Sequence, residues 1–187
     1  MRYDLKSFIE LDCDNISIIK YKTLEFIKSN VGLEKPQIPW IFLDLKKVLN
    51  FVPEFVLYFK QQKLFPRQCA CTILYNDLPL HVDAPPIIAK MNFPILNTQG
   101  WSNKWYKTDD AILNNLECKK DPLGFDNLDI SKLNIGDLQL QAELNDFENP
   151  IILNSQQLHN VEKTCSAKVP RIMITFTFLN DPWELLK

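Results

Sequence analysis

Histidine is scarce in this chain, and its two histidines, His81 and His159, both lie in segments with the composition of β-strands. Asp83 follows His81 by two residues. Residues i and i+2 of an extended strand point to the same face, so this imidazole and this carboxylate can bind one metal ion. His159 can supply a third ligand. Two imidazoles and one carboxylate on one face of an octahedron are the arrangement used for non-haem Fe(II), which leaves positions open for substrates.

Arg171 opens a strand twelve residues after His159. Alternation divides this strand into two faces, one with Arg171, Met173, Thr175 and Thr177 and the other with Ile172, Ile174, Phe176 and Phe178. The second face is apolar and suits packing, so the first can point inward. A buried guanidinium needs an anion, and its planar fork matches a carboxylate in a bidentate manner. Thr175 can add a hydroxyl donor on the same face.

The elements that must position these side chains are short. The chain has 12 proline and 4 glycine residues, and the prolines divide it into brief segments. Apolar spacing over residues 43–63 predicts two short helices, the second starting at Pro53. The segment Ile16 to Ile27, rich in Ile, Tyr, Thr and Phe, is expected to form one or two early strands, although its end, Phe26-Ile-Lys-Ser-Asn30, could also close a short helix. Later strands are expected at Cys69–Tyr75, Leu80–Asp83, Ile87–Leu96, Trp101–Tyr106, Gly136–Leu144, Pro150–Leu153, Leu158–Glu162 and Arg171–Leu179.

Helices followed by about eight short strands indicate a mainly β fold, either a sandwich or a double-stranded barrel with an N-terminal helical buttress. We expect a single domain over residues 1–187, with the N-terminal part at 1–66 and the β core at 67–180. The polar segment Asp109 to Asn134 is expected to be a long excursion that acts as a lid.

Composition excludes several function classes. The chain has 187 residues, 46% hydrophobic and 24% charged, with a net charge of −2 and no block of Lys or Arg, so we expect no nucleic-acid partner. No apolar run reaches the ~20 residues that cross a bilayer, and the charged start does not resemble a signal peptide, so we expect no membrane association and a cytoplasmic location. The glycines form neither a P-loop nor a dinucleotide-binding fingerprint.

The five cysteines are odd in number and scattered, which favours reduced thiols. Cys69 and Cys71 alternate within an apolar segment and are expected to be small buried residues on one strand face. Nothing in the spacing of Cys165 and His159 requires a nucleophilic pair.

His81-Val-Asp83, a distal His159 and an Arg171 shortly beyond it resemble the Fe(II)- and 2-oxoglutarate-dependent oxygenases. Flanking segments are similar to small prolyl-hydroxylase-like and aspartyl-hydroxylase-like members: Leu80-His-Val-Asp, Met91-Asn-Phe-Pro-Ile-Leu-Asn, Trp105-Tyr, Asn149-Pro-Ile-Ile-Leu-Asn and His159-Asn-Val-Glu. The resemblance covers residues 69–179. It implies a double-stranded β-helix, also called a cupin-like jelly roll, and the hydroxylation of a peptidyl or small-molecule substrate with O2 as co-reactant.

The resemblance also implies roles for single residues. Fe(II) would be bound by His81, Asp83 and His159, and Arg171 would pair with the C5 carboxylate of 2-oxoglutarate. Weaker candidates for cosubstrate contacts are Asn92, with Lys90 on the same face, Tyr75 and Thr175. Many relatives have a serine two residues after the arginine, where this chain has Met173, and Thr175 is the candidate substitute.

Two other readings stay open. One is a cupin-like module that binds a metal or ligand without oxygenase turnover. The other is a metal-dependent enzyme of another reaction type, in which Arg171 holds the carboxylate of the substrate itself. Trp101 and Trp105 are candidates for lining the pocket in each case.

Overall fold

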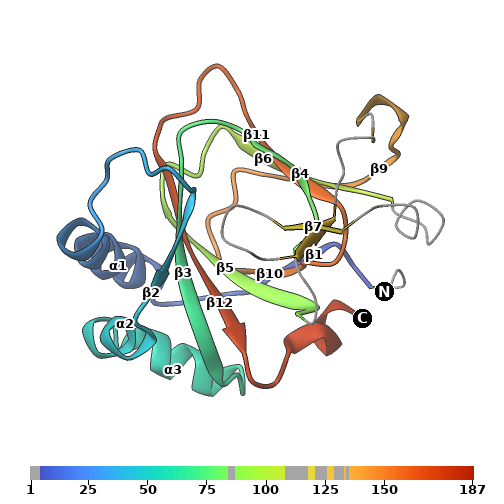
Figure 1. The fold of residues 1–187 in the computed structure, drawn as a ribbon. Helices are drawn as coiled ribbons and strands as arrows, with labels where there is room; N and C mark the ends of the chain where they lie inside the picture. Colours follow the sequence, from blue (N-terminus) through green and yellow to red (C-terminus); the bar gives the residue numbers. More distant parts are fainter. Residues whose placement is uncertain (1–4, 84–86, 108–117, 121–125, 129–132, 134) are drawn as a thin grey trace.

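The computed structural model describes residues 5–83, 87–107, 118–120, 126–128, 133 and 135–187. Two antiparallel sheets face each other, and three helices cover the outer side of the larger sheet (Figure 1). We call the space between the two sheets the interior. The mainly β architecture with N-terminal helices is as predicted.

The larger sheet has six strands in the order β1 (Phe8–Glu10), β10 (Ile151–Asn154), β5 (Ala89–Leu96), β12 (Arg171–Phe178), β3 (Pro66–Leu74) and β2 (Trp40–Leu43). The smaller sheet has four, in the order β4 (Leu78–His81), β11 (His159–Lys163), β6 (Trp101–Tyr106) and β9 (Leu140–Asn145). Strands β7 (Cys118–Lys120) and β8 (Asp126–Leu128) pair with each other, and short 3-10 turns lie at Ile135–Asp137 and Pro182–Leu186.

The helices are α1 (Ile16–Asn30), α2 (Leu45–Phe51) and α3 (Glu54–Gln61). The prediction of two short helices within residues 43–63 is confirmed. Asp44 caps α2 by accepting a hydrogen bond of 3.1 Å from the Lys47 N–H, and Pro53 directly precedes α3.

The prediction of early strands at Ile16 to Ile27 is wrong, because this segment belongs to α1. Its composition suggests strands, but its buried residues recur at helical spacing: Ile19, Thr23, Phe26 and Ile27. Packing of this one face against the sheet outweighs the β propensity of the individual residues.

Most of the expected strands are present. The strand expected at Gly136–Leu144 begins later, at Leu140, because a 3-10 turn occupies Ile135–Asp137. Strands β1 and β2 were not predicted, being short segments near the helices. Of the expected lid at residues 109–134, the structure describes 118–120, 126–128 and 133, and the rest lies outside the described residues.

Alternation along β12 separates two environments. Ile172, Ile174 and Phe176 face the helices, where the ring of Phe176 lies 4.9 Å from that of Phe55 and 4.8 Å from that of Phe59. Met173 faces the opposite way and packs in a smaller cluster that includes Trp105 of the other sheet. The strand therefore presents a packing face to the helices and a second face to the interior.

Cys69 and Cys71 are buried on the helix-facing side of β3, as expected, and the described thiols Cys13, Cys69, Cys71 and Cys165 are free. Within the described part of the chain, no helix has the length and apolar character needed to cross a membrane.

Candidate active site

His81 and His159 lie opposite each other on neighbouring strands β4 and β11, and their ring centroids are 4.1 Å apart. Each Nδ1 lies close to the carbonyl oxygen of the residue two positions earlier: 2.8 Å from Pro79 O and 2.7 Å from Gln157 O. A carbonyl oxygen can only accept, so Nδ1 of each ring carries the hydrogen. Both Nε2 atoms are left with a lone pair, which is the form of imidazole that binds metal ions.

Desolvation lowers the pKa of both histidines. For His159 burial is the main cause, the neighbouring His81 adds to it, and the pKa falls to about 3. The pKa of His81 is also lowered by desolvation, which outweighs the opposing charge of Asp83. Both rings are therefore neutral at pH 7, as metal ligands must be.

Asp83 follows β4, and its backbone N–H donates a 2.9 Å hydrogen bond to Ser155 O. Its carboxylate oxygen Oδ1 lies 2.8 Å from Nζ of Lys90 on β5. Desolvation raises the pKa of Asp83, but Lys90 and the two histidines lower it more, to about 2. The carboxylate is therefore ionised at pH 7, and Lys90 holds it through an ion pair.

The predicted ligand set is thus only partly brought together. The two imidazoles are adjacent, whereas Asp83 is engaged with Lys90. Among the residues that the structure describes, no three His, Cys, Asp or Glu side chains form a group that could hold a metal ion as they stand.

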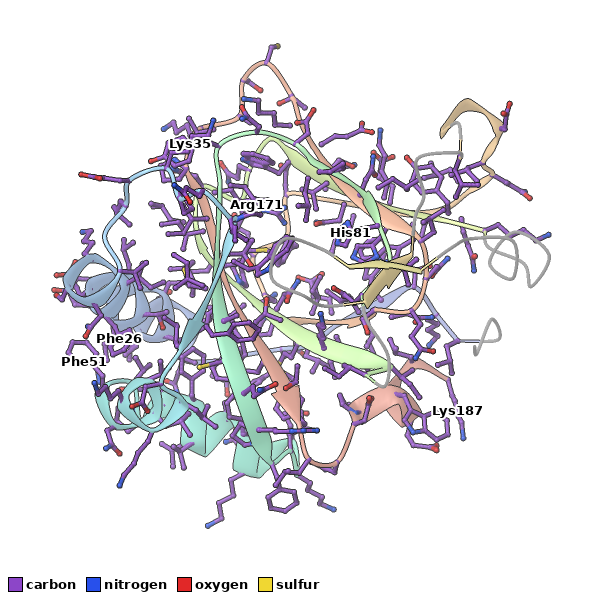
Figure 2. All side chains as sticks on the ribbon, in the orientation of Figure 1. Phe26, Lys35, Phe51, His81, Arg171 and Lys187 are labelled. Atoms are coloured by element: carbon purple, nitrogen blue, oxygen red, sulfur yellow. The ribbon has the colours of Figure 1, made fainter. Side chains whose placement is uncertain are left out.

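Arg171 is fully buried at the start of β12. Its Nη2 donates a 3.2 Å hydrogen bond to Oδ1 of Asn103 on β6, and its guanidinium lies 5.7 Å from the ring centroid of Trp101 and 5.4 Å from that of Phe147. Figure 2 shows the side chains of Arg171 and His81 in the space between the sheets. Burial lowers the pKa of Arg171 to about 9, so the guanidinium is still charged at pH 7.

Four buried donors in this region have no acceptor among the described residues: Nε and Nη1 of Arg171, Nδ2 of Asn103 and Nε1 of Trp105. A buried polar group without a partner costs about 1–3 kcal/mol, and more when it is charged. All four atoms are donors, and one group carries a positive charge. The chemistry of this set fits a ligand that brings acceptors and negative charge, as a carboxylate does.

Trp105 connects the donors to the histidines. It pairs with His159 across β6 and β11, and the two rings stack with centroids 6.4 Å apart. Phe8 of β1 stacks on Trp105 from the larger sheet, at 5.0 Å. Asn103 lies two residues from Trp105 on the same face of β6, so one strand reaches both Arg171 and His159.

The weaker candidates divide into two groups. Thr175 Oγ1 of β12 donates a 2.7 Å hydrogen bond to Asn92 Oδ1 of β5, so these two side chains are in direct contact. Thr175 lies four residues from Arg171, which is about 13 Å along an extended strand, and so it does not adjoin the guanidinium. The Tyr75 hydroxyl donates to the Leu33 carbonyl on the helical side, away from the other candidates.

Sequence reasoning missed Asn103. Its signal was present, because Asn103 is a polar residue between Trp101 and Trp105 at positions that share one face of a strand. Lys90 was recognised as facing the interior with Asn92, but its pairing with Asp83 could not be inferred from separation along the chain.

No protein-family model matches this sequence, and no curated protein is significantly similar to it. Solved structures are similar in fold. AviO1 from Streptomyces viridochromogenes Tue57 is 13% identical, with a TM-score of 0.52 over 97% of this chain and 94% of AviO1. HygX from Streptomyces hygroscopicus, with nickel and 2-oxoglutarate bound, is 10% identical, with a TM-score of 0.55 over 93% of this chain and 82% of HygX.

The epimerase SnoN, in complex with Fe3+, alpha ketoglutarate and nogalamycin RO, is 7% identical to this chain. Its TM-score is 0.61, over 95% of this chain and 80% of SnoN. At these identities the likeness establishes the fold, which is the jelly roll expected from the sequence.

Proposed function

We propose that this chain is an Fe(II)- and 2-oxoglutarate-dependent oxygenase that hydroxylates a peptidyl or small-molecule substrate. The observation that carries the proposal is the buried, incompletely paired guanidinium of Arg171. It faces the interior, and Asn103 and Trp105 of β6 link it to the strand pair that holds His81 and His159.

His81 and His159 would hold the iron through their Nε2 atoms, with Asp83 as the third ligand. The metal, when bound, supplies the activation of O2 and the oxidation of a C–H bond. The chain keeps both imidazoles neutral and fixes their orientation through the two Nδ1–H hydrogen bonds to backbone carbonyls.

Arg171 would pair with the C5 carboxylate of 2-oxoglutarate. Asn103 Nδ2 is a buried donor beside the guanidinium, which suits it to the hydrogen bond that a serine makes in many relatives and that Met173 cannot make. Met173 packs with Trp105 and Phe147 and helps to exclude water from this position. Asn92 and Thr175, farther along the same sheet, are proposed to contact the cosubstrate or substrate on another side.

Structures of the same fold support the metal and the cosubstrate. SnoN binds Fe3+ and alpha ketoglutarate, HygX binds nickel and 2-oxoglutarate, and SnoK is described as a non-heme alpha ketoglutarate dependent carbocyclase. SnoN is an epimerase, so this fold supports several outcomes with one cofactor set, and hydroxylation rests on the sequence resemblance.

An anaerobic titration with Fe(II) and then 2-oxoglutarate tests the proposal. We expect a weak visible charge-transfer band from the chelated cosubstrate. The band should be lost in His81→Ala and should need far more 2-oxoglutarate in Arg171→Ala. Tyr75→Phe is the matched control, because Tyr75 lies on the helical side. Absence of the band in a protein that binds iron would refute the cosubstrate assignment.

The binding module without turnover is the second candidate. The observation in its favour is that Asp83 is held by Lys90 and the described residues form no ready metal group. It predicts 2-oxoglutarate binding without succinate formation, even with a panel of peptide and small-molecule substrates. Formation of succinate in the presence of Fe(II) and O2 would exclude it.

A further inference from the structure

Lys90 connects the two sheets at the candidate metal site. Lys90 lies on β5, which is between β10 and β12 of the larger sheet. Asp83 lies two residues after the end of β4 in the smaller sheet. Their Nζ and Oδ1 atoms are 2.8 Å apart, and their side chains are 20% and 22% exposed. The pair is therefore partly shielded from solvent, where an ion pair is stronger than at the surface.

This pair differs from the ion pair between Lys104 and Glu162, which has a similar exposure. Lys104 Nζ lies 2.6 Å from Glu162 Oε2, with side chains 26% and 37% exposed, but these residues alternate with Trp105 and Val161 and so lie on the outer face of the smaller sheet. Each pair joins a lysine ammonium to a carboxylate, and the nitrogen–oxygen distances are similar. Of these two pairs, only Lys90–Asp83 involves a candidate metal ligand.

The ammonium engages one of the two carboxylate oxygens. Carboxylates that bind metals are themselves hydrogen-bonded, and the partner fixes their orientation. A carboxylate with Oδ1 committed to Lys90 retains Oδ2 for a metal, so it binds through one oxygen. One-oxygen binding leaves more of the coordination sphere free for the cosubstrate and O2 than binding through both.

We propose that Lys90 is a positioning residue: it holds Oδ1 of Asp83 so that the carboxylate offers Oδ2 alone to a metal bound by His81 and His159. The inference rests on the proposed function, because it takes these three residues as the ligands. Lys90 stays on Asp83 when the metal binds, and it is neither a metal ligand nor a competitor of the metal.

Removal of Lys90 therefore weakens metal binding. Loss of a hydrogen-bonding partner of a metal ligand typically costs 10–100-fold in affinity, and we expect Lys90→Met to raise the Kd for Fe(II) by about this factor. Lys90→Arg, which keeps a charged donor, should recover most of the affinity. Lys104→Met removes the same charge from the outer pair and should leave the Kd within about twofold.

The measurement is anaerobic calorimetric titration of each full-length variant with Fe(II) alone, so it depends neither on turnover nor on 2-oxoglutarate. Circular dichroism confirms folding. If Lys90→Met does not fold, Lys90→Leu, which also removes the donor, takes its place with the same expected loss of affinity.

The outcomes separate the two proposals. If the unmodified protein does not bind Fe(II), the proposed function fails, and the inference fails with it. If the unmodified protein binds Fe(II) but Lys90→Met binds equally well, the inference alone is wrong. Tighter binding by Lys90→Met would show that Lys90 competes with the metal for Asp83, and would also overturn the inference.

Discussion

Alternate residues of β12 lie in two different environments, one apolar and packed against the helices and the other polar and facing the interior. The face toward the helices carries Ile172, Ile174 and Phe176, which belong to the same core cluster as Phe55 and Phe59 of α3. The face toward the interior begins with Arg171, whose guanidinium is buried with two nitrogens that lack an acceptor among the described residues. Packing is complete on the first face and polar pairing is incomplete on the second. Stability should therefore depend on the first face and ligand binding on the second.

The largest effect on stability is expected on the helical side. Phe176→Ala should lower the free energy of unfolding by about 3–5 kcal/mol, because it leaves a cavity between β12 and α3. Urea titration measures the change. The fraction that remains folded should bind 2-oxoglutarate with unchanged affinity. A specific loss of that affinity would show that the two faces are not independent.

Acid should destabilise the interior before it affects the helical side. The pKa of His159 is about 6.5 in the unfolded chain and about 3 in the folded protein, so the unfolded chain gains the proton first. The stability of the metal-free protein is therefore full above pH 6.5 and falls as the pH drops from 6.5 toward 3. The pKa of Asp83 is lowered from 3.8 to about 2 on folding, so stability falls further as the pH drops from about 3.8 to about 2.

Melting temperatures measured from pH 8 to pH 3 test this dependence. His159→Gln, which cannot gain the proton, should show a flatter profile above pH 4. An identical profile in the two proteins would assign the acid sensitivity to other groups.

Arg171→Met should separate binding from stability. We expect 2-oxoglutarate affinity to fall at least about 100-fold, since charge-assisted hydrogen bonds to the carboxylate are lost. The ligand-free protein should be as stable as the unmodified one or more so, because an incompletely paired buried charge is replaced by an apolar side chain of similar length. Calorimetry measures the affinity, and urea titration measures the free energy of unfolding. A large loss of stability would show that the interior face of β12 contributes to stability as well as to ligand binding.

The smallest effect is expected for Tyr75→Phe. The change removes the hydrogen bond to the Leu33 carbonyl on the helical side and should lower the free energy of unfolding by about 1 kcal/mol. The Kd for 2-oxoglutarate should stay within about twofold. A tenfold increase in this Kd would show that Tyr75 contacts the cosubstrate.

Local rules were sufficient where a short period decides which face a residue occupies. The alternation that divides β12 follows from the strand backbone alone, whereas Asp83 lies beyond the end of β4 and is paired with Lys90. The same rules failed for α1, where composition suggested strands although the apolar spacing was helical. They also could not determine which polar residues of different segments meet. Asn103 and Arg171 lie on different strands and are 68 positions apart, and Lys90 of β5 meets Asp83, which follows β4.

Tyr75 illustrates the same limit. Its place at the end of a strand near the motif suggested a cosubstrate contact, but register puts Leu74 toward the interior cluster and Tyr75 toward the helices. A shift of one residue changes the face.

The stack of Phe8, Trp105 and His159 has an optical consequence. Trp105 is a buried fluorophore whose ring centroid lies 6.4 Å from that of a proposed iron ligand. A paramagnetic ion bound by His159 would quench its emission over such a distance. If the proposed site binds iron, Trp105 would report its occupancy, and comparison with Trp105→Phe would identify the signal of this residue among the four tryptophans.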